Sequence, residues 1–207
     1  ESVNLKFQVV KGPGYGLHGL NSGVCIATDV ELWNKPNFYL LAMIDQTRGE
    51  AVGFAHLFAE EIDGKKVLTV PGIEPSAEFL GEVKAREVYP LIVEALREVA
   101  KTGGFDRIVI PTDANILSNR KDIHDLVVKE NYPKANLPKA VNWNTVPQPY
   151  PFTEVYEVPV PARGLPAARG ASLGAESPEV LRIKLKIREM STRVHPDGSL
   201  IIKQLTE

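Results

Sequence analysis

The chain has 207 residues, with 24 Lys and Arg against 26 Asp and Glu, a formal net charge of −2 and a single cysteine. A membrane-spanning helix needs an apolar run of about 18 residues, and the chain has none of this length, which excludes a transmembrane protein. Its composition also excludes disulfide-stapled, collagen-like and wholly disordered chains. The near-neutral charge provides no global field for nucleic acid or anionic membranes. One cysteine and no signal peptide predict a reducing, cytoplasmic setting. Because Glu1 replaces an initiator Met, we expect a fragment of a larger protein.

The first half of the chain predicts antiparallel strands. Val3–Val10 alternates in hydropathy as a strand does. The glycine-rich stretch Lys11–Gly23 matches neither the dinucleotide fingerprint nor the P-loop, so we expect a flexible loop there. Short apolar runs separated by turns that contain Asp and Gly are typical of hairpins. The sequence therefore predicts an antiparallel meander over Phe38–Ile44, Ala51–Phe58 and Lys66–Val70.

The hydrophobic period then changes from that of a strand to that of a helix. Apolar residues form one stripe over Glu82–Lys101, and a pair of glycines follows where a helix C-cap is expected. The β-branched segment Phe105–Pro111 predicts a buried strand, and a second helix is expected over Arg120–Glu130 with Asn119 as its N-cap. Strand, helix and strand in this order predict a right-handed crossover and a parallel strand pair, so we expect a mixed sheet.

A region rich in Pro, Ala and Gly divides the chain. The stretch Val158–Gly174 has neither helical nor strand periodicity. We therefore expect an α/β domain over residues 1–157, a linker over residues 158–178 and a β-hairpin over residues 179–207. Such a hairpin is too small to be stable alone. We expect it to pack on the body, on a second copy of the chain or on another protein.

One face of the predicted hairpin is basic and carries Arg182, Lys184, Lys186 and Arg188. A solvated strand face is one interpretation, and an acidic partner or nucleic acid is another. Because no aromatic side chain that could stack on a base lies between these cations, nucleic acid is the less favoured partner.

The order of meander, long helix, buried strand and short helix resembles the GNAT N-acyltransferase superfamily over Phe38–Tyr132. Within this region, Asp45–Leu57 carries a turn and a hydrophobic-Gly pair that opens the next strand, as in that family. Val67–Ile73 looks like the strand whose splayed backbone pairs with the pantetheine arm of coenzyme A. Arg120–Tyr132 is similar to the last helix of the family.

The resemblance implies a GNAT-like α/β (α+β) fold with a mixed sheet, in which an antiparallel meander continues into a β-α-β crossover, followed here by the C-terminal β-hairpin. It also implies that Val70, Gly72 and Ile73 hold the acyl donor. A ligand cleft is expected between the end of Val67–Val70 and the start of Phe105–Ile110.

The sequence departs from the family pattern at two places. The family binds pyrophosphate with a Gln/Arg-x-x-Gly-x-Gly/Ala turn at the start of the long helix, and this chain has Glu74, Glu78 and Glu82 there. These carboxylates would repel a pyrophosphate by on the order of 1 kcal/mol per close pair. Val127 stands where the family frequently has a Tyr that protonates the leaving thiolate. Both departures favour a donor other than ordinary acetyl-CoA, such as an acyl carrier protein or an acyl-tRNA, or a domain that only binds.

Ser118, Asn119 and Arg120 follow the carboxyl end of the predicted buried strand, where open α/β sheets place ligands. They bring a hydroxyl, an amide and a guanidinium to a helix start, which suits an anion or a carboxylate, and we predict that they bind substrate. The alternative is a helix cap with a solvated Arg. Asp113 and Asn115 would complete a polar rim under either interpretation.

Other side chains have structural as well as functional interpretations. The apolar neighbours of Cys25 favour a buried thiol, and a nucleophilic role would need His18, His56 or His124 as its base. The histidines show no paired spacing, so no metal site is expected. Large rings are expected to anchor long loops more often than to line a cleft, and these rings belong to Trp33, Phe38, Tyr39 and Trp143.

The sequence thus predicts a divergent acyltransferase-like domain that moves an acyl group to an amine, with a small molecule or an acyl carrier as its partner and no membrane contact. The alternative is a catalytically silent GNAT-like module that binds or scaffolds within a larger protein, so whether the chain is an enzyme stays open. A thiol enzyme that uses Cys25 is a third hypothesis. The acyl donor or cofactor, acyl-CoA among the choices, and the oligomeric state also stay open.

Overall fold

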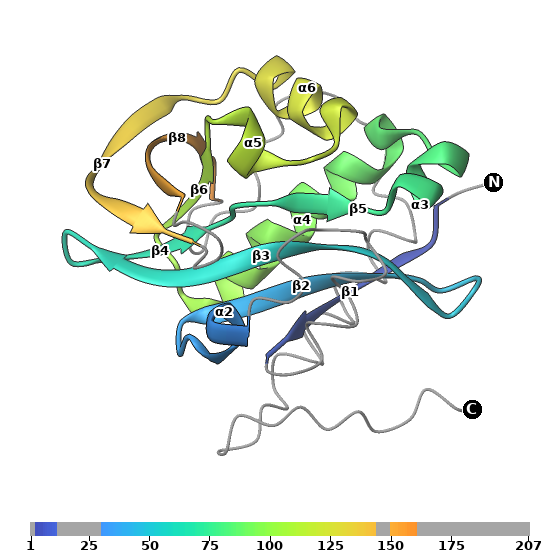
Figure 1. The fold of residues 1–207 in the computed structure, drawn as a ribbon, viewed down its shortest axis with the longest axis horizontal. Coiled ribbons are helices and arrows are strands. Elements are labelled where there is room, and N and C mark those ends of the chain that lie inside the picture. The colour runs from blue at the N-terminus through green and yellow to red at the C-terminus, as the bar shows by residue number, and fades with distance from the viewer. Residues whose placement is uncertain (1–2, 12–29, 144–149, 161–207) are drawn as a thin grey trace.

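The computed structural model describes residues 3–11, 30–143 and 150–160, and these form one mixed sheet with helices on its faces (Figure 1). The strand order is β1-β2-β3-β4-β6-β8-β7, and β5 pairs with β3 outside this path. In chain order, the elements are β1 (Leu5–Val10), α2 (Val30–Asn34), β2 (Phe38–Asp45), β3 (Glu50–Ile62), β4 (Lys65–Thr69), β5 (Ile73–Pro75), α3 (Ala77–Glu82), α4 (Ala85–Gly103), β6 (Arg107–Pro111), α5 (Ala114–Leu117), α6 (Lys121–Lys129), β7 (Lys134–Asn142) and β8 (Pro151–Val158).

The predicted meander is confirmed. The first four strands pair in sequence order and antiparallel, with Phe38 of β2 opposite Phe58 of β3 and Phe58 opposite Thr69 of β4. β3 extends to Ile62 because it pairs with three strands. β2 lies along one side of it, while β4 and β5 share the other side.

Gly53 permits the close approach of β5 to β3. The φ of Gly53 is +156°, and an added Cβ would lie 2.5 Å from the Cα of Pro75. No other residue type could occupy this position without moving the backbone. The hydrophobic-Gly pair noted in the sequence therefore has a packing reason.

The crossover is confirmed as well. α4 joins β4 to β6, which pair in parallel with Val67 opposite Arg107. The helix ends at Gly104, whose left-handed φ of +69° lets its N–H bond to the carbonyls of the last turn. This topology confirms the mixed α/β sheet expected from the sequence, in which an antiparallel meander continues into a β-α-β crossover.

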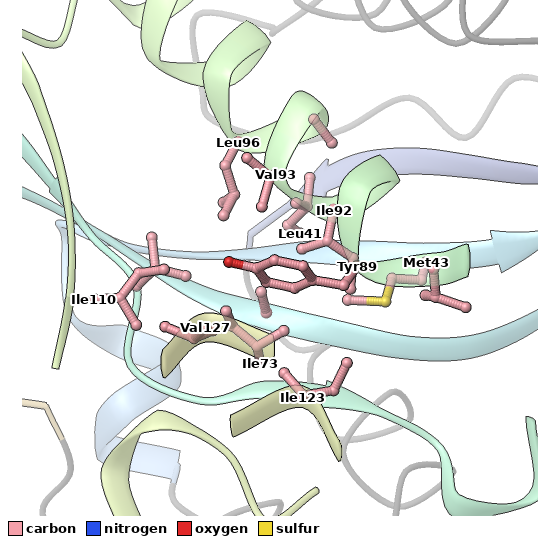
Figure 2. Close-up of a cluster of buried hydrophobic side chains, with 14 of the residues drawn as sticks. Leu41, Met43, Ile73, Tyr89, Ile92, Val93, Leu96, Ile110, Ile123 and Val127 are labelled. Carbon is pink, nitrogen blue, oxygen red and sulfur yellow. The ribbon is translucent and has the colours of Figure 1, made fainter. Parts of the chain in front are cut away.

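Two hydrophobic cores lie on the two faces of the sheet. One packs α4 and α6 against the sheet, and Figure 2 shows the ring of Tyr89 from α4 among Ile73, Ile110 and Val127. The other contains Leu32 of α2 together with side chains from α5 and β7. The sheet is therefore covered on both sides, as in other α/β folds.

β7 and β8 were not predicted from the sequence. β8 pairs antiparallel with β6, and β7 forms an edge of the sheet. Pro151 opens β8, and Pro138 lies in β7 where the register shifts. Prolines are tolerated at the first residue of a strand and on an edge strand. Because this stretch is rich in proline, the sequence pattern did not indicate the two strands.

Two helix starts differ from the prediction. A short helix, α3, precedes the long one, which begins at Ala85 with Lys84 as its N-cap and not at Glu82. α6 has Arg120 as its N-cap, so the prediction of Asn119 was wrong. The predicted linker, apart from residues 158–160, and the C-terminal hairpin lie outside the described residues.

Candidate functional site

The strands β4 and β6 separate at their carboxyl ends. They begin together, since the backbone N–H of Lys66 donates to Asp106 Oδ2 at 2.9 Å and that of Asp106 donates to the Lys66 carbonyl at 2.8 Å. The last shared bond runs from Val70 N–H to the Val109 carbonyl at 2.9 Å. Because parallel strands start at the same edge, the start of one cannot face the end of the other. The expected cleft position was therefore wrong, and the separation lies beyond Val70 and Val109.

Beyond this point, the segment Ser118–Arg120, here called the strap, lies along β5. The Ser118 hydroxyl donates to the Ile73 carbonyl at 2.6 Å. Arg120 Nε donates to the Pro75 carbonyl at 2.8 Å, and the Arg120 N–H donates to the Ser118 hydroxyl at 2.9 Å. The strap is thereby bonded to β5 along its length.

Gly72 fixes the turn that leads into β5. It has a φ of +77°, and an added Cβ would lie 2.4 Å from His56 Nδ1. Its carbonyl accepts from the His56 N–H at 3.1 Å, and its own N–H donates to the Ile116 carbonyl at 2.8 Å. The His56 ring is buried, and burial lowers the pKa of His56 to about 4. His56 is therefore a neutral structural residue at neutral pH.

Glu74 is the buried carboxyl of this region, with 3% of its surface exposed. Its Oε1 accepts a hydrogen bond from the Asn119 N–H at 2.8 Å, while its Oε2 is buried and has no partner among the described residues. Burial raises the pKa of Glu74 to about 7, against the opposing effects of the Asn119 bond and the Arg120 charge. A carboxyl with this pKa exchanges a proton near neutral pH.

The three carboxylates do not form the cluster that the sequence suggested. Glu74 points into the protein, Glu78 is exposed in the first turn of α3, and Glu82 forms an ion pair with Arg48. They also precede the start of the long helix, which is flanked by the cations Lys84 and Arg86. The expected cluster of three acids was therefore wrong, whereas repulsion of a pyrophosphate by these side chains stays a prediction.

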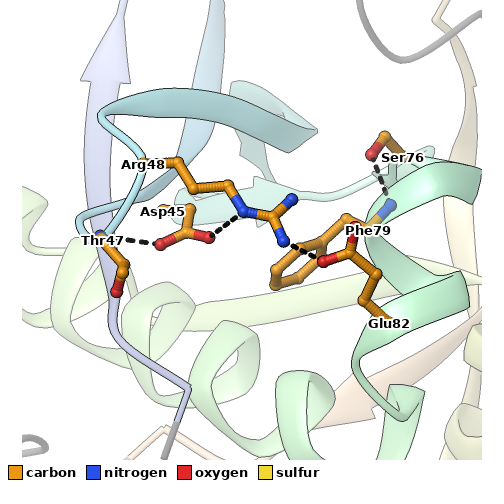
Figure 3. A network of polar contacts seen from close by, with 6 residues as sticks. All are labelled: Asp45, Thr47, Arg48, Ser76, Phe79 and Glu82. Atoms are coloured by element: carbon orange, nitrogen blue, oxygen red, sulfur yellow. Dashed lines mark hydrogen bonds and ion pairs between the residues drawn. The ribbon is translucent and has the colours of Figure 1, made fainter.

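The turn between β2 and β3 is tied to α3 (Figure 3). Asp45 Oδ1 accepts from the Thr47 N–H at 2.8 Å, and Asp45 Oδ2 lies 3.7 Å from Arg48 Nε. The Arg48 guanidinium also forms an ion pair with the Glu82 carboxylate, and this contact raises the pKa of Arg48. Beside it lies an open hollow of about 410 Å³, lined by Arg48 and Glu78 among others.

The structure brings the two predicted groups of site residues together. Val70, Gly72 and Ile73 were expected to hold the donor, and each has a backbone group bonded within the chain. Ser118, Asn119 and Arg120 donate to the Ile73 carbonyl, the Glu74 carboxyl and the Pro75 carbonyl of β5. Upstream, the Asp113 carboxylate caps α5 by accepting from the Asn115 N–H at 2.8 Å. Glu74, which joins both groups, was missed as a buried residue, although its position between Ile73 and Pro75 placed it in an apolar segment.

Val127 is buried in α6, and two tyrosines that the sequence analysis did not select lie on the same side of the sheet. The Tyr89 hydroxyl donates to the Tyr132 hydroxyl at 3.3 Å, and burial raises the pKa of both phenols. These groups hold their protons at neutral pH.

The remaining candidates are partly described. Phe38 and Trp143 are buried in the second core, and the Trp143 ring lies 5.3 Å from that of His56. The Lys11 ammonium lies over the Tyr39 ring at 4.3 Å. His18, Cys25 and the Trp33 side chain lie outside the described residues, as does the basic stripe of the predicted hairpin.

No family model matches the chain, and no curated protein matches it in sequence. Among solved structures, it is similar to an aminoglycoside acetyltransferase from an uncultured soil metagenomic sample, at 13% identity over 63% of this chain and 88% of that one, with a TM-score of 0.44. It is also similar to a Trypanosoma brucei acetyltransferase, at 16% identity, 67% and 99% coverage and a TM-score of 0.42. A variant of the spermidine N-acetyltransferase SpeG from Vibrio cholerae is similar at 12% identity over 74% of this chain and 91% of that one, with a TM-score of 0.45.

Among the residues that the structure describes, no helix is long and apolar enough to cross a membrane. The same residues contain no group of three or more His, Cys, Asp or Glu side chains that could hold a metal ion.

Proposed function

We propose that this domain transfers an acyl group to an amine and that Glu74 accepts the proton of the amine. An amine must lose its proton to form an amide, and a general base works best when its pKa lies near the operating pH. Glu74 has a pKa of about 7 at the point where β4 and β6 separate. This single observation carries the proposal, within an acyltransferase-like fold.

The donor proposed is one other than ordinary acetyl-CoA. An extended thioester arm would need free backbone groups along Val70–Pro75, and the Gly72 N–H, the Ile73 carbonyl and the Pro75 carbonyl are all bonded within the chain. Such an arm, whether acetyl-CoA or an acyl carrier protein supplies it, does not fit this arrangement unless the strap and the α5 contact at Gly72 open, so an acyl-tRNA is the donor that these contacts favour. Val70, Gly72 and Ile73 stay the proposed donor contacts, and the strap residues stay the proposed substrate contacts.

The test is acyl transfer to a panel of amines, followed by mass spectrometry, with acetyl-CoA, an acylated carrier protein and an acyl-tRNA as donors. With a productive pair, Glu74→Gln should lower kcat by about 10²-fold or more, the usual contribution of a general base. Glu78→Gln is the matched control, because Glu78 is an exposed carboxylate a few residues away. Transfer by Glu74→Gln at the wild-type rate would exclude this role.

A catalytically silent binding module is the second candidate, and the strap favours it, since it bonds to the strand that a donor would use. This candidate predicts that Arg120→Ala leaves every measured transfer rate unchanged. It also predicts no heat of binding with acetyl-CoA at millimolar concentration. A clear loss of transfer in Arg120→Ala would exclude the silent module.

A further inference from the structure

The strap and β5 are joined residue by residue. Ser118, Asn119 and Arg120 bond to Ile73, Glu74 and Pro75 in that order. The first and last contacts use backbone carbonyls of β5, which do not titrate. The middle contact uses the Glu74 carboxyl, so one of the three depends on a group that can change its charge.

The environment of that carboxyl suits its neutral form. Glu74 is buried, and its Oε2 has no hydrogen-bond partner among the described residues. An ionised carboxylate needs partners for both oxygens, and burial without them is costly. Opening of the strap would release Oε1 from Asn119 and leave the carboxyl able to turn toward water, which solvates the ionised form.

Few charged groups from the neighbouring elements oppose this preference. Arg120 in the strap is the cation whose field reaches Glu74. His56 on β3 lies on the same face of the sheet as Phe54, which is opposite Glu74, and it is neutral above a pKa of about 4. Glu78 on α3 is exposed. Arg120 and the Asn119 N–H favour the ionised form, but burial outweighs them.

We propose that the strap is a pH-responsive closure of β5, shut while Glu74 is protonated and opening as the pH rises through neutrality. The direction follows from linkage. The pKa of Glu74 is raised from 4.5 to about 7 in the closed state, so the closed state binds the proton more tightly. The free energy by which protonation favours the closed state over the open state is fully present below about pH 4.5 and is lost as the pH rises through about 7.

Opening would expose the groups that the strap now covers. The carbonyls of Ile73 and Pro75 would be free to accept hydrogen bonds, and the Glu74 carboxylate would reach solvent. The inference goes beyond the proposed function, because it concerns a conformational equilibrium that exists without any substrate.

Hydrogen exchange of the whole chain, resolved by residue in NMR spectra, tests the proposal directly. The Asn119 and Arg120 amides report on the strap, and the Val70 amide, which bonds to Val109, reports on the adjoining strand pair. After correction for intrinsic exchange, protection of the two strap amides should fall roughly tenfold between pH 6 and pH 8, then level off. Protection of the Val70 amide should not follow this profile. A flat profile for the strap amides would overturn the proposal.

Three variants separate the carboxyl from other causes. Glu74→Gln keeps an acceptor for Asn119 but cannot ionise, so its strap protection should not depend on pH and should exceed the wild-type value at pH 8. Glu78→Gln should retain the wild-type profile. Ser118→Ala removes one non-titrating contact, so it should lower protection at every pH while retaining the dependence. A wild-type slope in Glu74→Gln would also overturn the proposal, whether or not acyl transfer is ever detected.

Discussion

The carboxylate of Glu74 accepts a 2.8 Å hydrogen bond from the backbone N–H of Asn119, which is 45 residues further along the chain. This bond joins the start of the segment that follows β4 to the segment that follows β6. It lies where the two parallel strands separate, so the edge of the sheet that a ligand would approach is already bonded within the chain.

The first prediction concerns Glu74 and the stability of the whole domain. Glu74→Gln should unfold with the same free energy as wild type near pH 4, where both side chains are neutral. Above pH 7 the variant should be more stable by roughly 1–3 kcal/mol, because ionised Glu74 in wild type must then either stay buried with its charge or give up the strap contacts. Urea unfolding at pH 4, 6 and 8 measures the difference. A variant less stable than wild type at pH 8 would show that Glu74 is held in its ionised form.

A second prediction concerns the protonation of His56 at low pH. The pKa of His56 is lowered from 6.5 to about 4, so its contribution to stability is present above pH 6.5 and is lost as the pH falls through about 4. The His56 ring resonances should therefore stay those of neutral imidazole down to about pH 4 in an NMR titration. Protonation near pH 6.5 in the folded protein would contradict the buried position of the ring.

Gly53→Ala is predicted to destabilise the domain by roughly 1–3 kcal/mol, because its Cβ would clash with the backbone of Pro75 and its φ is unfavourable for other residues. Gly81→Ala is the matched control. An added Cβ there meets nothing within 4 Å, and alanine favours the helix. Chemical unfolding should give a clearly lower free energy of unfolding for Gly53→Ala than for Gly81→Ala. Equal values would mean that the backbone of β5 does not lie close enough to Gly53 to exclude a Cβ.

Val127→Tyr tests whether a hydroxyl can be placed at the position where the GNAT resemblance expects a Tyr, and we expect that it cannot. Val127 is completely buried against α4 and the sheet, so a larger ring should cost about 1–3 kcal/mol through overpacking. Val128 on the same helix is 45% exposed, and Val128→Tyr should leave stability near wild type. Thermal unfolding of both variants checks this. A stable Val127→Tyr protein with faster acyl transfer would overturn the interpretation.

Local patterns predicted most of the architecture. Alternation marked β2, β3 and β4, and a stripe with helical period marked α4 together with its glycine stop. These signals are strong because the periods of a strand and a helix differ and because each element buries one face. The elements missed were those rich in proline or too short to show a period, namely α2, β5, α3, α5, β7 and β8.

The sequence by itself determined the order of β1, β2, β3, β4, α4, β6 and α6, the mixed sheet and the position of a polar segment after β6, since these depend on residues close together in the chain. It could not show that Glu74 is buried or that Asn119 bonds to it and does not cap α6. Those facts depend on contacts between segments 45 residues apart. Only the tertiary structure decided that an apparent surface acid is an internal carboxyl, because desolvation, which sets its charge, is a property of the packed chain.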